Sequence, residues 1–118
     1  SHQVGGLLDL PHGVINGVLL PHVIRFNAAA DPMPYVAIAA SLGLPEGRAS
    51  AEEAALAVAE RVEQLARQVG VPVGLREIGV SDADIDVLAT NALRDACMST
   101  NPRQATHAEM ASLFRAAL

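Results

Sequence analysis

The sequence predicts an all-α fold, and three observations support this prediction. Ala, Leu and Val dominate the apolar half of the chain, and aliphatic side chains of this kind favour close-packed helices. Three stretches carry the spacing of a helix capping box, in which a hydroxyl residue precedes a carboxylate by three positions: Ser50 with Glu53, Ser81 with Asp84, and Thr106 with Glu109. No stretch alternates apolar and polar residues as a β-strand would. The 118 residues suit a single domain, 1–118.

Five helices are expected, and the first two lie in the N-terminal third of the chain. The first covers 12–26, and Pro21 should kink or divide it because proline cannot donate the helical hydrogen bond. The second covers 31–43, where Gly43 is suited to end a helix in the left-handed conformation. The segment 1–13 is rich in glycine and has no helix-start signal, so we expect it to be a cut through a larger protein.

The remaining three helices each begin at a capping box. The third covers 50–70, and its apolar spacing predicts one buried face, formed by Val58, Val62, Leu65 and Val69. A short helical turn is expected at 75–78. The fourth helix begins at Ser81, and the fifth begins at Thr106 after the break at Asn101-Pro102.

Charge and composition exclude several classes of partner. The net charge is −5, and the eight basic residues are all Arg and lie scattered along the chain, which argues against binding to nucleic acid or to an anionic membrane. The apolar runs are shorter than the ~20 residues that a membrane-spanning helix needs. Cys97 is the only cysteine, so no internal disulfide is possible and a reducing cytoplasm is expected.

Four histidines could hold a transition metal, and helix geometry limits their combinations. His12 and His22 on one helix would lie ~15 Å apart along its axis, so they cannot share an ion unless Pro21 folds the helix back. The glycine-rich stretch between His2 and His12 would allow those two to converge. Spacing alone favours a structural place for His12, a core or subunit contact for His22, and an exposed place for His107.

Other possible sites have weaker support. Cys97 could be a thiol nucleophile, but its helical neighbours Leu93 and Ala96 are apolar, which favours a buried, inert thiol. No GxGxxG turn or Walker lysine is present for binding phosphate.

Several motifs together resemble the iron-containing alcohol dehydrogenases. The N-terminal motifs are HQVGG at 2–6, LPHG at 10–13, and LLPHV at 19–23 followed by Phe26-Asn27. Further matches are IA and LG at 38–43, GVP at 70–72 with Leu75 and Gly79-Val80, and the stretch from Cys97 through NPR at 101–103 to Thr106. The resemblance covers essentially the whole chain.

This resemblance implies a helical bundle that corresponds to the C-terminal domain of such an enzyme. In the family an Asp and three His hold Fe²⁺ or Zn²⁺ between this domain and an N-terminal domain that binds NAD or NADP. By motif, His12 matches the last of the ligand histidines. His2 matches a histidine near the nicotinamide and substrate, and Cys97 lies in a segment that approaches the substrate pocket. The other metal ligands and the nucleotide-binding domain would lie upstream of Ser1.

The implied function is the interconversion of alcohols and aldehydes or ketones by a cytoplasmic, homo-oligomeric enzyme. This chain alone is expected to be inactive, because one histidine cannot hold a metal tightly and hydride transfer needs a bound nicotinamide. The alternative is a non-enzymatic helical module with an interaction or structural role. The substrate and the choice between NAD and NADP remain open.

Overall fold

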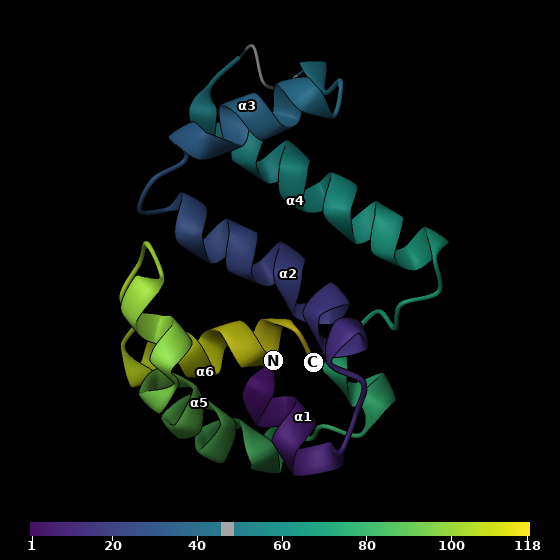
Figure 1. Ribbon diagram of the computed structural model, residues 1–118, viewed down its shortest axis with the longest axis vertical. Coiled ribbons are helices and arrows are strands. Elements are labelled where there is room, and N and C mark those ends of the chain that lie inside the picture. Colours follow the sequence, from purple (N-terminus) through teal and green to yellow (C-terminus); the bar gives the residue numbers. More distant parts are fainter. Residues whose placement is uncertain (46–48) are drawn as a thin grey trace.

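A computed structural model describes residues 1–45 and 49–118, and every regular element in these ranges is a helix (Figure 1). The all-α prediction is therefore confirmed. The α-helices are α1 (His2–Leu8), α2 (His12–Ala28), α3 (Met33–Ser41), α4 (Ala51–Gln68), α5 (Ile85–Arg94) and α6 (His107–Ala116). Short 3₁₀ helices are η2 (Leu75–Ile78), η3 (Asp82–Asp84) and η4 (Ala96–Thr100).

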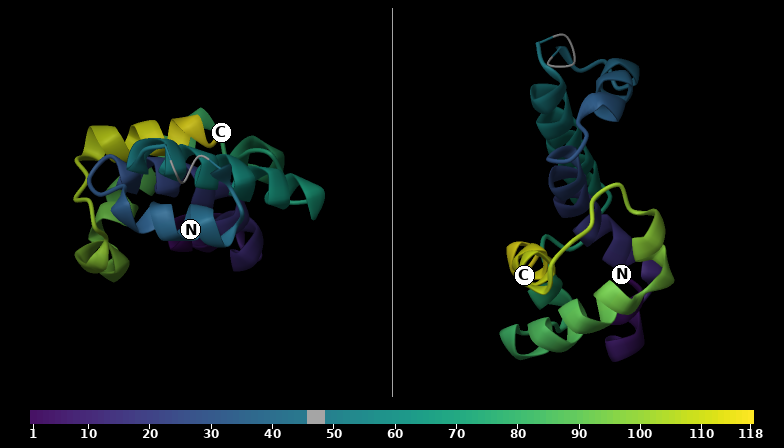
Figure 2. Two further views of the ribbon diagram at one scale, coloured as in Figure 1. Left: turned by 90° about the horizontal axis from the view of Figure 1, so that it is seen from above. Right: turned by 90° about the vertical axis from the view of Figure 1, so that its left-hand side faces the viewer.

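Helix α2 connects two groups of helices, each with its own core. The larger core lies between α1, the first half of α2, η2, α5 and α6, and its fully buried side chains include Val4, Ile15, Leu75 and Leu88. The smaller core lies where α3 and α4 pack against the end of α2, around Ala39, Val58 and Ile24. Figure 2 shows the α3–α4 pair standing beyond the α1–α5–α6 group, which gives a molecule 41 × 31 × 20 Å across.

The predicted capping starts at Ser50 and Thr106 are confirmed, whereas Ser81 begins the 3₁₀ helix η3, which leads into α5 at Ile85. Ser81 with Asp84 and Thr106 with Glu109 form reciprocal capping boxes, and the Ser50 hydroxyl accepts the Glu53 backbone N–H at 3.1 Å. These bonds satisfy donors that the first helical turn leaves without partners. Gly43 and Gly70 follow the second and third predicted helices, and both have the left-handed backbone expected there, with φ of 71° and 80°.

Two sequence-based expectations about the helices were wrong, and a third was wrong in part. Pro21 does not divide its helix, because α2 continues through this residue, which is buried. Residues His2–Leu8 form α1 although they lack a capping signal, because fully buried Val4 ties this segment to the larger core. On α4, Leu65 and Val69 are 49% and 68% exposed, and neither belongs to the smaller core that covers Val58.

No helix in the described part of the chain is both long and apolar enough to cross a membrane.

Candidate metal and substrate site

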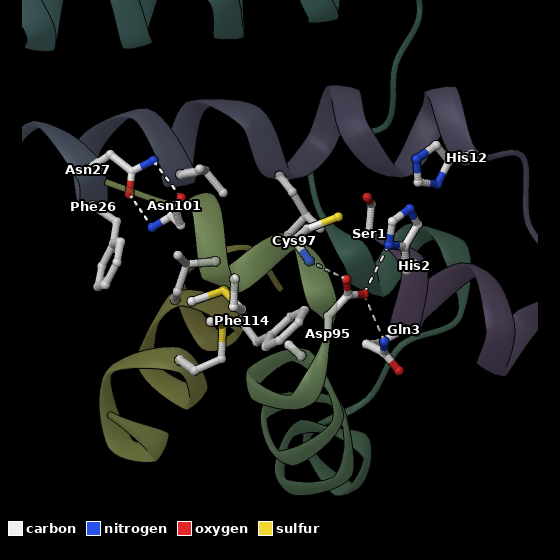
Figure 3. Close-up of a pocket in the computed structure, with 16 residues that line it drawn as sticks. Ser1, His2, Gln3, His12, Phe26, Asn27, Asp95, Cys97, Asn101 and Phe114 are labelled. Atoms are coloured by element: carbon white, nitrogen blue, oxygen red, sulfur yellow. Dashed lines mark hydrogen bonds and ion pairs between the residues drawn. The ribbon is translucent and has the colours of Figure 1, made fainter. Parts of the chain in front are cut away.

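His2 and His12 lie face to face at the junction of α1 and α2. Their ring centroids are 5.0 Å apart and the ring planes differ by 13°. The short connection reverses the chain at Asp9, whose φ of 50° is left-handed. The convergence of the two histidines, which the sequence allowed, is therefore present (Figure 3).

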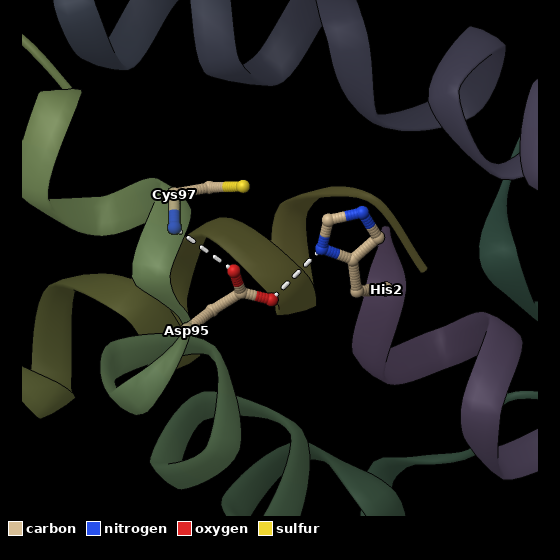
Figure 4. A group of neighbouring side chains, drawn as sticks. All are labelled: His2, Asp95 and Cys97. Carbon is tan, nitrogen blue, oxygen red and sulfur yellow. Dashed lines mark hydrogen bonds and ion pairs between the residues drawn. The ribbon is translucent and has the colours of Figure 1, made fainter.

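Asp95 is the centre of a hydrogen-bonded group that also contains His2. Its Oδ2 lies 2.9 Å from His2 Nδ1 and accepts from Gln3 Nε2 at 3.2 Å, while its Oδ1 accepts the Cys97 backbone N–H at 3.0 Å (Figure 4). The bond from the Cys97 backbone, followed by that from His2, holds the pKa of Asp95 well below its ordinary value of 3.8. Asp95 is therefore an ionised acceptor at neutral pH.

The sequence reasoning missed Asp95. A signal was available, because an Asp two residues before Cys97 can cap the turn that contains Cys97. Its carboxylate does cap η4 through the Cys97 N–H, and this cap also turns the second oxygen toward α1.

Cys97 is exposed, so the expectation of a buried thiol was wrong. The reason is local: the chain leaves the α-helix at Asp95, which is extended, and Cys97 belongs to η4 instead of continuing the face of Leu93. A hydrogen bond to Asp95 and the nearby negative charge raise the pKa of the Cys97 thiol. The thiol is therefore held in its neutral form, which disfavours a role as nucleophile.

A cavity of about 410 Å³ opens beside these groups (Figure 3). One end carries His2, His12, Asp95 and Cys97, and another part is lined by Asn27 and Asn101. Between them the walls are apolar and come mainly from α2, η4 and α6: Leu19, Val23, Phe26, Met98, Met110, Leu113 and Phe114. An apolar cavity with a few polar groups at one end is typical of a small-molecule site.

Two sets of side chains at this end of the cavity could bind a metal: the group of His2, Asp95 and Cys97, and His12 by itself. One donor atom from each of His2, Asp95 and Cys97 lies within 4.8 Å of the others, but Asp95 already accepts protein hydrogen bonds on both oxygens. A metal there would displace those bonds. His12 differs, because within the described ranges its exposed ring stacks on His2 and has no hydrogen-bond partner. His12 therefore fits one metal-ligand position, and residues 1–45 and 49–118 offer no complete ligand set around it.

The other two histidines lie away from this cavity. His22 is half-buried, and burial, followed by the nearby charge of Arg25, lowers its pKa. His107 is exposed on α6, where its Nε2 lies 3.2 Å from Thr90 Oγ1, as expected for a surface residue. Neither joins His12, so the long separation of His12 from His22 predicted from helix geometry agrees with the structure.

The chain was compared with known families, sequences and structures. The description "Fe-containing alcohol dehydrogenase family, C-terminal" matches residues 1–118. The chain is 41% identical over 117 residues to a 1,3-propanediol dehydrogenase of Citrobacter freundii, and 43% identical over 117 residues to a lactaldehyde reductase of Escherichia coli. Each alignment covers 99% of this chain. The chain spans only 30% of the length of the first relative and 31% of the second.

Solved structures agree with the sequence comparison. A crystal structure of a 1,3-propanediol oxidoreductase superposes with a TM-score of 0.94 at 40% identity, covering 99% of this chain and 31% of that chain. An alcohol dehydrogenase from Oenococcus oeni also gives a TM-score of 0.94, at 35% identity, covering 99% of this chain and 30% of that one. The chain belongs to the iron-containing alcohol dehydrogenase family and corresponds to the C-terminal helical part of its members.

Proposed function

We propose that this chain forms the helical wall of the active site in an NAD(P)-dependent, metal-containing alcohol dehydrogenase. The observation that carries the proposal is the place of His12, whose ring lies unpaired among the described residues at an apolar cavity, with His2 stacked on it. The relatives named above are, by name, enzymes of 1,3-propanediol and lactaldehyde, and a third is a NAD-dependent methanol dehydrogenase of Bacillus methanolicus. The substrate class is therefore a small alcohol and its aldehyde or ketone.

His12 would supply one imidazole nitrogen to Fe²⁺ or Zn²⁺, with the remaining ligands coming from parts of a longer protein. When bound, the ion supplies a Lewis acid for the substrate oxygen. The contribution of this chain is to hold the His12 ring in place, because the ring is stacked on His2 at the start of α2.

The cavity would bind the carbon skeleton of the substrate. Its apolar walls exclude water and place the hydrocarbon part between α2 and α6, while the hydroxyl or carbonyl group meets the end that carries His2 and His12. Cys97 would line this end as a neutral side chain. His2 would exchange the proton of the substrate hydroxyl, directly or through a water molecule.

The nicotinamide cofactor, NAD or NADP, would be bound mainly outside this chain. The relatives are more than three times as long as this chain, since it covers 30% of their length, and the sequence here contains no glycine-rich phosphate-binding turn. The same proposal includes a cytoplasmic location and a homo-oligomeric assembly. The partner is a small molecule, and neither nucleic acid nor a membrane is bound.

Steady-state oxidation of short alcohols and diols tests the proposal. The assay would use NAD and NADP with added Fe²⁺ or Zn²⁺, on this chain and on the longer protein that contains it. We expect turnover only with the longer protein. Turnover by the chain alone would contradict the proposal that the remaining metal ligands and the nicotinamide site lie outside this chain. An inactive, metal-free longer protein would instead favour the non-enzymatic helical module.

A further inference from the structure

We propose that Asp95 is a positioning residue that fixes the tautomer of the His2 imidazole. In this arrangement Nδ1 carries the ring proton and donates it to Asp95, which leaves Nε2 as the proton-accepting atom on the side of the ring away from Asp95. The tautomer depends only on residues of this chain and can be measured without the longer protein. Its consequence for turnover rests on the proposed function, in which His2 exchanges a proton with the substrate.

The geometry of the contact supports a fixed orientation. His2 Nδ1 and Asp95 Oδ2 are 2.9 Å apart although 93 residues separate them in sequence. The backbone of η4 holds the carboxylate through the Cys97 N–H, and Gln3 supports the same oxygen that contacts His2. On its other side the His2 ring stacks on His12, which opposes rotation of the ring. In Figure 4 the second ring nitrogen of His2 points away from Asp95.

The direction of the hydrogen bond follows from the chemistry of the two groups. An ionised carboxylate has only acceptor sites, so His2 must donate from Nδ1. A neutral imidazole carries a single ring proton, and Nε2 is then the acceptor. The alternative tautomer would place two acceptors 2.9 Å apart, which is unfavourable.

The different partners of the two Asp95 oxygens predict how an asparagine side chain would be oriented at this position. In Asp95→Asn, the amide oxygen would keep the place of Oδ1, because that atom must accept the Cys97 backbone N–H. The NH₂ group would then take the place of Oδ2 and donate to His2 Nδ1. The ring proton would move to Nε2, so the side chain would lose its acceptor on the side away from Asp95. The same inversion is known from the carboxylate-to-amide change in serine-protease triads.

Long-range ¹H–¹⁵N correlation spectra of the ¹⁵N-labelled chain test the tautomer directly. At about pH 8, where an ordinary imidazole is neutral, we expect His2 to show a protonated Nδ1 and an unprotonated Nε2. We expect the pattern to be inverted in Asp95→Asn and unchanged in the matched control Asp9→Asn, which alters an exposed carboxylate near the end of α1. A His2→Gln variant identifies the His2 signals, and His107 in the same spectra serves as an internal reference.

Two results would overturn the proposal. The first is a wild-type spectrum in which His2 carries its proton on Nε2, and this result needs no variant to fold. The second is an unchanged tautomer in a folded Asp95→Asn chain, with folding checked by circular dichroism.

Kinetics of the longer protein test the consequence for turnover. We expect Asp95→Asn to keep its metal content and KM for the alcohol while kcat falls at least about tenfold, and we expect Asp95→Glu to recover part of the loss. Adding His2→Gln to Asp95→Asn should cost little more than His2→Gln alone, because both changes act on one group. An unchanged kcat in Asp95→Asn would show that positioning does not matter for turnover. An inactive wild type would instead refute the proposed function, and the spectra would still decide the tautomer.

Discussion

Asn27 and Asn101 exchange a pair of amide hydrogen bonds across 74 residues of sequence. Asn27 Nδ2 donates to Asn101 Oδ1 at 3.1 Å, and Asn101 Nδ2 donates to Asn27 Oδ1 at 2.9 Å (labelled in Figure 3). The same Asn101 amide donates to the carbonyl of Arg103 at 2.6 Å. This pair joins the end of α2 to the segment between η4 and α6, so it holds together the two sides of the cavity.

We expect Asn27→Ala to lower the free energy of unfolding by about 1–3 kcal/mol, because Asn101 Oδ1 would lose its donor and Asn101 Nδ2 would keep only the Arg103 carbonyl. Asn27 is 8% exposed, so water has little access to replace the lost bonds. Urea unfolding monitored by circular dichroism measures the effect. Asn16→Ala is the control on the exposed side of the same helix. Equal stability of the two variants would show that the pair contributes nothing.

Gly74 is expected to tolerate no side chain, because the C-terminus of the chain lies against it. A Cβ at this position would come within 2.5 Å of the carbonyl oxygen of Leu118, and the adjacent Leu75 N–H bonds to the carbonyl of Ala117 at 2.7 Å. We expect Gly74→Ala to reduce stability by about 1–3 kcal/mol through backbone displacement.

Gly6→Ala is the matched control for Gly74→Ala. A Cβ at Gly6 meets no atom within 4 Å, and Gly6 lies inside α1, where alanine should stabilise the helix by roughly 0.5–1 kcal/mol. Opposite signs for the two changes, measured as shifts in the thermal midpoint, would support the packing of η2 on the C-terminus. A stabilising Gly74→Ala would contradict it.

The fold was largely predictable from the sequence because the helix starts are encoded locally. The hydroxyl and carboxylate of each predicted capping pair lie three residues apart in sequence and bond at the helix start. Helix α1 was not predictable in this way, since its stability comes from burying Val4 against residues of α2, α5 and α6. The exposure of Leu65 likewise depends on which neighbours the tertiary fold places beside it, which periodicity cannot show.

The candidate site was predictable in part. The motif resemblance indicated His2, His12 and Cys97, and all three line one cavity. Asp95 was missed because its contact with His2 joins residues 93 positions apart, and the local sequence indicates only that Asp95 can cap the turn of Cys97. The exposure of Cys97 depends on the change from α-helix to 3₁₀ helix at Asp95, which no apolar pattern encodes.

Acid should weaken the start of α6, because Glu109 must be ionised to complete its capping box. The Thr106 backbone N–H, followed by the Thr106 hydroxyl and Arg103, lowers the pKa of Glu109 from 4.5. A lowered pKa in the folded state means that the stabilisation is present above about pH 4.5 and is lost as the pH falls through the folded value.

We therefore expect Glu109→Gln to be less stable than wild type at about pH 6, with a difference that shrinks towards about pH 3. The free energy of unfolding, measured by urea titration across this range, provides the test. Glu52→Gln, which alters an exposed carboxylate in the first turn of α4, is the matched control. A difference between Glu109→Gln and wild type that is constant with pH would contradict the role of the charge.

The chain alone should bind Fe²⁺ or Zn²⁺ weakly. Of the two histidines that line the cavity, His2 bonds to Asp95 and only His12 has no hydrogen-bond partner among the described residues, whereas a catalytic metal needs about three protein ligands. Isothermal titration calorimetry with Zn²⁺ should give no tight equimolar site. If a tight site were found and were lost in Cys97→Ser, the group of His2, Asp95 and Cys97 would be a metal site of its own.

We propose that His12 holds the catalytic metal at the end of this cavity that also carries His2. The most direct test of this claim is the metal content of the purified longer protein, measured together with alcohol oxidation, for wild type, His12→Ala and the surface control His107→Ala. We expect His12→Ala to lose metal and activity together, while His107→Ala keeps both. Full metal content and normal turnover in His12→Ala would contradict the claim.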